Sequence, residues 1–198
     1  NFLVKEFIKG DPFKSIRQSV NFLRFKKYPL KSLMLVTHIR GGGTEKYVKW
    51  FTKSVSEKDL SVWILKPLRA GKVERGCNLS LVVDGEEEFS EEFRGSRWHK
   101  DLLAFCKCLE LKHISFQHVV DFPKEILSLS QDLNVSADFT FHDFYTISPT
   151  ITLTDKKGFF DKTQIDSPNR KWAGRYSPFL KVMKRLYVPS QSTYEIVK

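Results

Sequence analysis

Apolar residues follow two alternating patterns along most of this chain. Short apolar runs predict buried strands, and apolar residues that recur every three or four positions predict helices. The strand pattern covers residues 33–40, 60–65, 78–83, 114–119, 137–141 and 186–190. The helical pattern covers residues 44–51, 98–109, 123–133 and 176–183. Strands that alternate with helices predict an α/β domain with a mainly parallel sheet flanked by helices.

The first strand runs directly into three glycines, Gly41–Gly43, and then into a helix with Tyr47 and Phe51 on one face. This is the opening unit of a doubly wound domain, in which ligands bind outside the carboxyl ends of the strands. Glycines let a backbone approach an anion closely, and a helix N-terminus offers free N–H groups to a phosphate. The spacing matches neither a dinucleotide fingerprint nor a P-loop. A phosphate site and a plain turn both fit this stretch.

A second candidate site follows the strand predicted at 137–141, which ends in His142-Asp143-Phe144-Tyr145. A titratable pair at the carboxyl end of a parallel strand lies where this fold class places its chemistry. An irregular stretch begins at Thr146. A long loop behind such a strand is typical of a segment that shapes a pocket.

Two further groups of polar residues are interpreted as structural. The five acids between Glu86 and Glu92 follow a predicted charged turn at 85–88, and we expect a solvated polar loop there rather than paired catalytic carboxylates. His99, His113 and His118 show no partner pattern, and we expect structural roles for all three.

Residues 1–32 form a basic N-terminal segment ahead of the domain at 33–198. An amphipathic helical pattern over residues 2–27 breaks at Gly10-Asp11-Pro12. Residues 1–50 hold eleven Lys and Arg against three acids, within a net charge of +10 for the chain. A basic apolar stripe either packs on the domain or rests on an anionic lipid surface.

Composition fits one ordinary domain. At 198 residues with 41% hydrophobic and 14% aromatic residues, the chain can bury a core, and disorder is not expected. No apolar run approaches the roughly 18 residues of a membrane span. Cys77, Cys106 and Cys108 lack the spacing of a disulfide framework or a metal site, with the last two expected at the core and the boundary of a helix. A reduced, cytoplasmic setting follows.

Three segments together resemble the N-terminal half of a GT-B glycosyltransferase of family 4, of the kind that builds bacterial surface polysaccharides. Residues 37–48 (THIRGGGTEKYV) are similar to that family's opening turn, H-x-x-G-G-G-x-E-x-x-V. Residues 142–149 (HDFYTISP) are similar to its H-D-Y-Y-x-x-C-P segment, with Ser148 in place of Cys. Residues 188–190 (VPS) resemble the strand that closes the first Rossmann-like domain.

The resemblance implies a metal-independent, retaining transferase that uses no cofactor. It moves a sugar from a nucleotide-sugar donor to a glycan or lipid-linked acceptor. The donor-binding C-terminal domain is missing from these 198 residues, so the chain alone is expected to be inactive. His142 is the expected catalytic residue, contacting an acceptor hydroxyl or the transferred sugar. The expected substrate-binding residues are His38, Gly41, Gly42, Gly43, Thr44, Asp143 and Tyr145.

Two other readings compete with the transferase. The first is a non-catalytic basic α/β module that binds nucleic acid or an anionic membrane, but no RNA-binding aromatic signature or helix-turn-helix spacing is present, and no nucleic-acid partner is expected. The second is a hydrolase, which is disfavoured because the chain has no G-x-S-x-G elbow. For the transferase, an acceptor carried by lipid predicts a peripheral position at the inner face of the plasma membrane.

Overall fold

The computed structural model describes residues 31–55, 60–149, 151–153, 155, 157, 159, 161 and 170–197. The strands are β1 (Lys31–Val36), β2 (Ser61–Pro67), β3 (Gly76–Val83), β4 (Glu86–Arg94), β5 (Glu110–Phe116), β6 (Ala137–Thr140) and β7 (Arg185–Tyr187). The helices are α2 (Gly43–Val55), α3 (Trp98–Lys107), α4 (Leu129–Leu133), α6 (Arg170–Lys181), α7 (Gln191–Val197) and the 3₁₀ helix η2 (Lys124–Ser128).

All seven strands form one sheet in the order β4-β3-β2-β1-β5-β6-β7. Strands β2, β1, β5, β6 and β7 are parallel, whereas β3 and β4 are antiparallel additions at one edge. The mainly parallel α/β sheet predicted from the sequence is therefore confirmed, and the arrangement is Rossmann-like. The chain leaves β1 toward β2 and later returns to the other side of β1 as β5, so the strand order reverses between β1 and β5.

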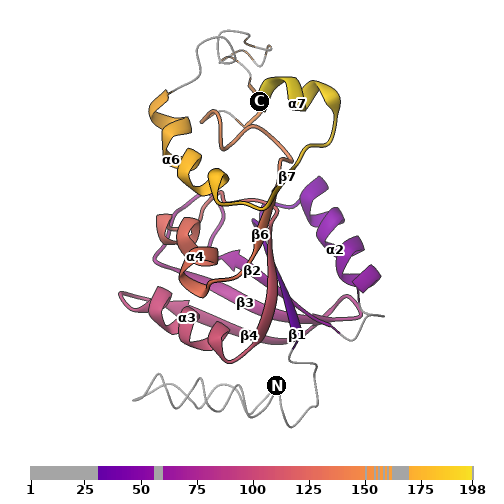
Figure 1. Ribbon diagram of the computed structural model, residues 1–198, viewed down its shortest axis with the longest axis vertical. Coiled ribbons are helices and arrows are strands. Elements are labelled where there is room, and N and C mark those ends of the chain that lie inside the picture. The colour runs from indigo at the N-terminus through magenta and orange to yellow at the C-terminus, as the bar shows by residue number, and fades with distance from the viewer. Residues whose placement is uncertain are drawn as a thin grey trace.

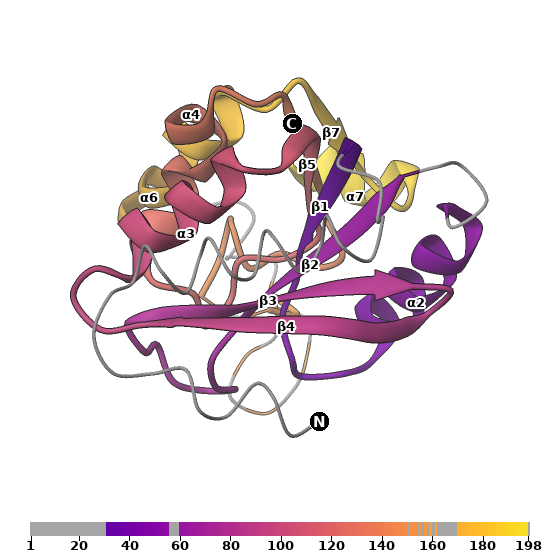
Figure 2. The same cartoon turned by 90° about the horizontal axis from the view of Figure 1, so that it is seen from below.

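Helices cover the two faces of the sheet unequally. Figures 1 and 2 show α3, α4 and α6 over one face, with α2 over the other. The side chains of Met34 and Val36 join the larger core under the three helices, whereas Leu35 packs with Val48 and Ile64 under α2. This split follows from the period-two alternation of side chains along a strand. The same alternation decides which side chains of β5 and β6 face the α2 side.

The sequence prediction was wrong about residues 85–92. Asp84 and Gly85 form the turn, both with positive φ, and the acids lie on strand β4 rather than on a loop. Strand β4 is the sheet edge, and its side chains are mostly exposed. A charged edge strand resists pairing with other chains, which explains acids at this position. The expectation that these acids face solvent was correct.

Several predicted boundaries also move. Strand β1 ends at Val36 rather than at residue 40, and β5 ends at Phe116 rather than at 119. The helix predicted at 123–133 is a 3₁₀ turn followed by a short α-helix. Helix α6 begins at Arg170, earlier than predicted, and contains Pro178. The strand predicted at 186–190 is the three-residue β7.

The amphipathic segment at residues 2–27 lies outside the described residues. Within the described ranges, no helix is long and apolar enough to cross a membrane. Cys77 and Cys106 are buried free thiols, and burial raises the pKa of Cys106 to about 12. Cys108 is exposed just after α3. The prediction that Cys106 and Cys108 lie in the core and at the boundary of a helix is confirmed.

Candidate functional site

The segments that follow β1, β5 and β6 meet at the carboxyl edge of the parallel strands. His38 follows β1, His118 follows β5, and His142 and Asp143 follow β6. The ring centroids of His38 and His118 lie 4.8 Å apart, and His118 bonds directly to Asp143. The structure thus brings the two predicted segments, after β1 and after β6, into one cluster at the point where the strand order reverses.

His118 lies at the centre of this cluster and is 3% exposed. Its Nδ1 accepts a hydrogen bond of 3.0 Å from the backbone N–H of Val120, so the ring proton is on Nε2. That Nε2–H donates to Oδ2 of Asp143 at 2.7 Å. Burial would raise the pKa of Asp143, but the hydrogen bonds from His118 and from the Tyr145 amide outweigh burial and lower it. Asp143 is therefore held as a carboxylate.

His38 is fixed by its own turn. Its Nδ1 accepts a hydrogen bond of 3.2 Å from the backbone N–H of Arg40, which leaves Nε2 as the protonated nitrogen of the neutral ring. Burial is the largest influence on the ring and lowers the pKa of His38. At neutral pH His38 is an uncharged hydrogen-bond donor at the edge of the cluster.

His142 contacts α2 and the segment that follows β5. Its Nε2 lies 2.8 Å from Oε1 of Gln117, and its ring centroid lies 5.5 Å from that of Tyr47 on α2. Burial lowers the pKa of His142, so the ring is neutral at neutral pH. The helix that begins at the glycine turn therefore contacts the residue predicted to be catalytic.

An ion pair braces the turn after β1. The guanidinium of Arg40 donates from Nε and Nη2 to the two oxygens of Asp121 at 2.8 and 2.7 Å. The Gly71 amide donates to the same carboxylate at 3.0 Å. Burial opposes ionisation of Asp121, but the bonds from Arg40 and Gly71 prevail and lower its pKa. Hydrogen bonds to the Asp121 carboxylate therefore link the loops that follow β1, β2 and β5.

The glycine turn has two different parts. Gly41 and Gly42 adopt φ of 79° and 86°, a left-handed conformation that favours glycine. Gly43 begins α2, and beyond its chain neighbours and the backbone of α2 no atom lies within 4 Å of the place a Cβ would take. The buried Thr44 follows it. A cavity of about 230 Å³ between α2 and the sheet is lined by Gly41 and by the buried Thr37, among others.

Tyr145 forms a wall of the cluster. Its ring centroid lies 5.5 Å from that of His118, and its carbonyl accepts a hydrogen bond of 2.6 Å from Nε1 of Trp172 on α6. Aromatic contacts with Trp172 and Tyr176 extend this wall. The start of the irregular stretch after β6 is thereby anchored to α6.

Sequence reasoning missed four members of the site: Arg40, Gln117, His118 and Asp121. His113 and His118, which show no partner pattern in the sequence, each bond to an aspartate of the neighbouring segment. A usable signal was present in β5, where polar residues at 113, 115 and 117 alternate with apolar ones at 114 and 116. That period of two predicts one polar face on the strand.

Among the residues that the structure describes, no group of three or more His, Cys, Asp or Glu side chains is arranged to hold a metal ion. Comparisons with known proteins give no further identification: no family model, no curated protein and no solved structure matches this chain. The site must therefore be interpreted from its own geometry.

Proposed function

We propose that this chain is the N-terminal, acceptor-side domain of a GT-B glycosyltransferase. In this proposal, a sugar passes from a nucleotide-sugar donor to a glycan or lipid-linked acceptor of a cell-surface polysaccharide. In such an enzyme a second domain holds the donor nucleotide. The observation that carries the proposal is the convergence of the glycine turn and His142 at the carboxyl edge of the sheet, at its switch point.

The chemistry of the histidines supports an uncharged hydroxyl-bearing ligand. His38 and His142 both have lowered pKa values, so neither carries charge at neutral pH. Among the residues that the structure describes, no hydrogen bond engages Nε2 of His38 or Nδ1 of His142. One donor and one acceptor therefore remain for a ligand, which suits a sugar hydroxyl that both donates and accepts.

The start of α2 supports a neighbouring position for the donor diphosphate. The first N–H groups of a helix have no intrahelical partner and bind anions favourably. The space around Gly43 is open, because nothing beyond its chain neighbours and the backbone of α2 lies within 4 Å of the place a Cβ would take. In the proposed enzyme the leaving diphosphate is stabilised there, by dipoles that are fixed before the reaction.

Binding to the chain itself tests the acceptor assignment. A short-chain polyprenyl diphosphate saccharide should shift the NMR signals of His142, Asp143 and Tyr145. His142→Ala should weaken that binding about tenfold, which corresponds to ~1.4 kcal/mol for one lost hydrogen bond. His99→Ala serves as the control, because His99 lies on α3 beyond the opposite face of the sheet.

Two results would contradict the proposal. One is an acceptor titration that leaves these three residues unchanged while RNA or anionic vesicles bind, which would favour a basic binding module. The other is equal affinity of the saccharide for the chain and for its His142→Ala variant.

A further inference from the structure

A row of polar side chains on the α2 side of the sheet connects His142 to a cavity near the start of β6. Nε2 of His142 lies 2.8 Å from Oε1 of Gln117, and Nε2 of Gln117 donates to Oγ of Ser115 at 2.8 Å. Ser115 donates to Oδ1 of Asp138 at 2.5 Å. Nε2 of His113 contacts Oδ2 of the same carboxylate at 2.7 Å. The side chains of His142, Gln117, Ser115, Asp138 and His113 thus form one continuous hydrogen-bonded row.

The strand register explains why these side chains meet. Ser115 of β5 pairs with Asp138 of β6 across the parallel ladder, and paired residues project from the same face. His113 and Gln117 lie two positions before and after Ser115, so they share that face. The α2 helix packs on Leu35, Val62 and Ile64 of the neighbouring strands β1 and β2.

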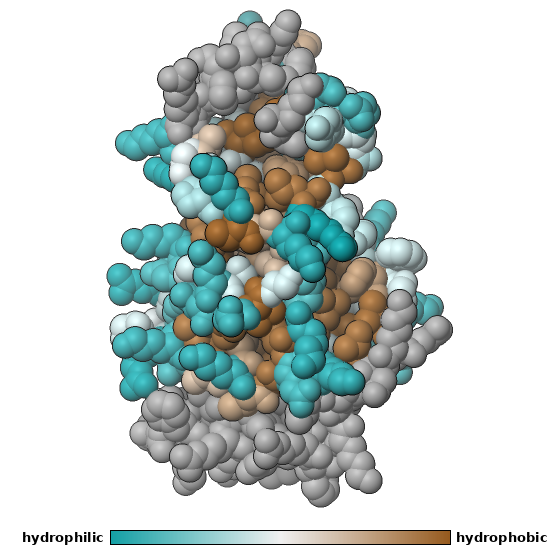
Figure 3. Space-filling view, viewed as in Figure 1, coloured by the Kyte–Doolittle hydropathy of each residue, from teal (hydrophilic) through white to brown (hydrophobic). Residues whose placement is uncertain are grey.

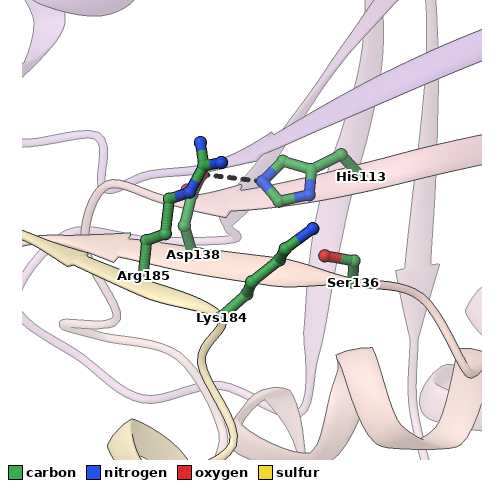
Figure 4. Close-up of a pocket in the computed structure, with 5 residues that line it drawn as sticks. All are labelled: His113, Ser136, Asp138, Lys184 and Arg185. Carbon is green, nitrogen blue, oxygen red and sulfur yellow. Dashed lines mark hydrogen bonds and ion pairs between the residues drawn. The ribbon is translucent and has the colours of Figure 1, made fainter.

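The end of the hydrogen-bonded row away from His142 lies in a cavity of about 270 Å³, which is lined by His113, Ser136, Asp138, Lys184 and Arg185. Figure 4 shows the Arg185 guanidinium beside the Asp138 carboxylate and the bond between Asp138 and His113. Lys184 and Arg185 add two positive charges to the lining of this cavity. Asp138 is nearly buried, with 8% of it exposed.

The direction of each bond follows from Asp138. A carboxylate has no proton to donate, so the single hydroxyl proton of Ser115 goes to Asp138. Oγ of Ser115 must then accept from the amide NH₂ of Gln117, which turns Oε1 of Gln117 toward His142. Because Oε1 only accepts, Nε2 of His142 must carry the ring proton.

We propose that Gln117, Ser115 and Asp138 are positioning residues that hold His142 in its Nε2–H tautomer. In this tautomer Nδ1 of the same ring carries a free lone pair and can accept a hydrogen bond. A glutamine alone would not fix this state, because its amide can turn over and offer NH₂ instead of oxygen. Ser115 and Asp138 remove that freedom. The tautomer follows from this hydrogen-bonded row alone. Only its use toward an acceptor hydroxyl rests on the proposed function.

The tautomer can be read from the ring ¹⁵N shifts of His142, measured on the histidine-labelled chain above the pKa of the ring. We expect Nε2–H in the wild type. In Asp138→Asn, His113 keeps the amide oxygen and Ser115 receives the NH₂. The three bonds from position 138 through Ser115 and Gln117 to His142 then reverse, whereas the bond from His113 does not. We expect His142 to change to Nδ1–H as its major form in this variant.

A double variant shows whether the effect travels through Ser115. In a Ser115→Ala background, Asp138→Asn should leave the shifts of His142 unchanged, because the hydrogen-bonded row is already interrupted at position 115. Ser136→Ala is the matched control, since Ser136 lines the same cavity but is not part of the hydrogen-bonded row. It should leave His142 as Nε2–H.

Gln117→Glu tests the contact with His142 without a change at Asp138. A carboxylate beside Nε2 keeps the Nε2–H tautomer and should raise the pKa of His142 by about one to three units. This result stands even where Asp138→Asn lowers the yield of folded protein. The proposal is overturned by an Nδ1–H tautomer in the wild type, by unchanged His142 shifts in folded Asp138→Asn, or by no response to Gln117→Glu. A confirmed tautomer together with equal saccharide affinity of the wild type and His142→Ala would reject the proposed function alone.

Discussion

Arg40 and Asp121 form a two-bond ion pair across the point where the strand order reverses. Arg40 follows β1 and Asp121 follows β5, and the two bonds measure 2.8 and 2.7 Å. Asp121 has a positive φ of 66° and is only 6% exposed, so its carboxylate depends on Arg40 and the Gly71 amide. The pair holds the loops of the candidate site together.

Loss of this pair should destabilise the fold. We expect Arg40→Ala to lower the free energy of unfolding by about 2 kcal/mol, less than a fully buried pair because the Arg40 side chain is 39% exposed. Arg40→Lys should cost about 1 kcal/mol, since an ammonium lacks the two-pronged geometry. Urea titration measures both. Arg94→Ala, which breaks an exposed pair with Glu92, should cost much less than Arg40→Ala, and an equal cost at both sites would contradict this account.

Neighbouring glycines in the turn should respond differently to alanine. Gly42→Ala places a Cβ at a φ of 86° and should cost about 1 kcal/mol of unfolding free energy. Gly43→Ala lies in the first turn of α2 with open space around it and should be neutral or stabilise by up to about 1 kcal/mol. Thermal melts of the two variants provide the comparison. A larger loss in Gly43→Ala would refute the described turn.

Stability should fall as the pH drops below the ordinary pKa of histidine. Burial lowers the pKa of His38 and His142 in the folded chain, so below about pH 6.5 the unfolded chain binds more protons than the folded one. Each ring then contributes a slope of at most about 1.4 kcal/mol per pH unit, down to its folded pKa. Urea midpoints from pH 8 to pH 5 should show this loss. His38→Gln/His142→Gln should flatten the profile, and an unaltered profile would show that other groups cause it.

The sequence predicted best the elements whose signals are local. The apolar run, glycine turn and amphipathic helix around Gly41–Gly43 sit within one stretch, and the structure has that unit as β1 and α2. Strand β4 was missed because it is an edge strand with charges on both faces, so it lacks the period of a half-buried strand.

Gln117 and His118 were missed because the end of one strand was misplaced. With β5 predicted to run to residue 119, Gln117 and His118 fell inside the sheet. Because β5 ends at Phe116, both lie at its carboxyl edge, where ligand-facing residues gather. The bond from Arg40 to Asp121 joins residues 81 positions apart, and no local pattern encodes such a pairing.

The exposed apolar side chains of the described residues include Trp50, Leu186, Tyr187 and Tyr194. Figure 3 shows hydrophobic surface interleaved with hydrophilic side chains on one face of the molecule. Such mixed surface carries no assignment by itself, since apolar atoms make up much of any protein surface.

The basic N-terminal segment, which lies outside the described residues, predicts reversible binding to anionic lipid. Each Lys or Arg near such a surface contributes about 1 kcal/mol, screened by salt. Liposome sedimentation should therefore require anionic lipid, weaken with salt and fall on neutralisation of the basic residues Lys5, Lys9, Lys14, Arg17, Arg24, Lys26 and Lys27. Equal sedimentation with neutral and anionic vesicles, or none with either, would leave the segment a packing role only.

Sugar transfer by a protein that joins this domain to a donor-binding half tests the central claim most directly. Labelled nucleotide sugars and lipid-linked acceptors should give a glycosylated lipid product, whereas the 198-residue chain alone should give none. We expect His142→Ala to lower kcat/KM at least about tenfold, or ~1.4 kcal/mol of transition-state stabilisation, with His99→Ala unchanged. Absence of transfer from every nucleotide sugar, or an undiminished rate in His142→Ala, would contradict the account.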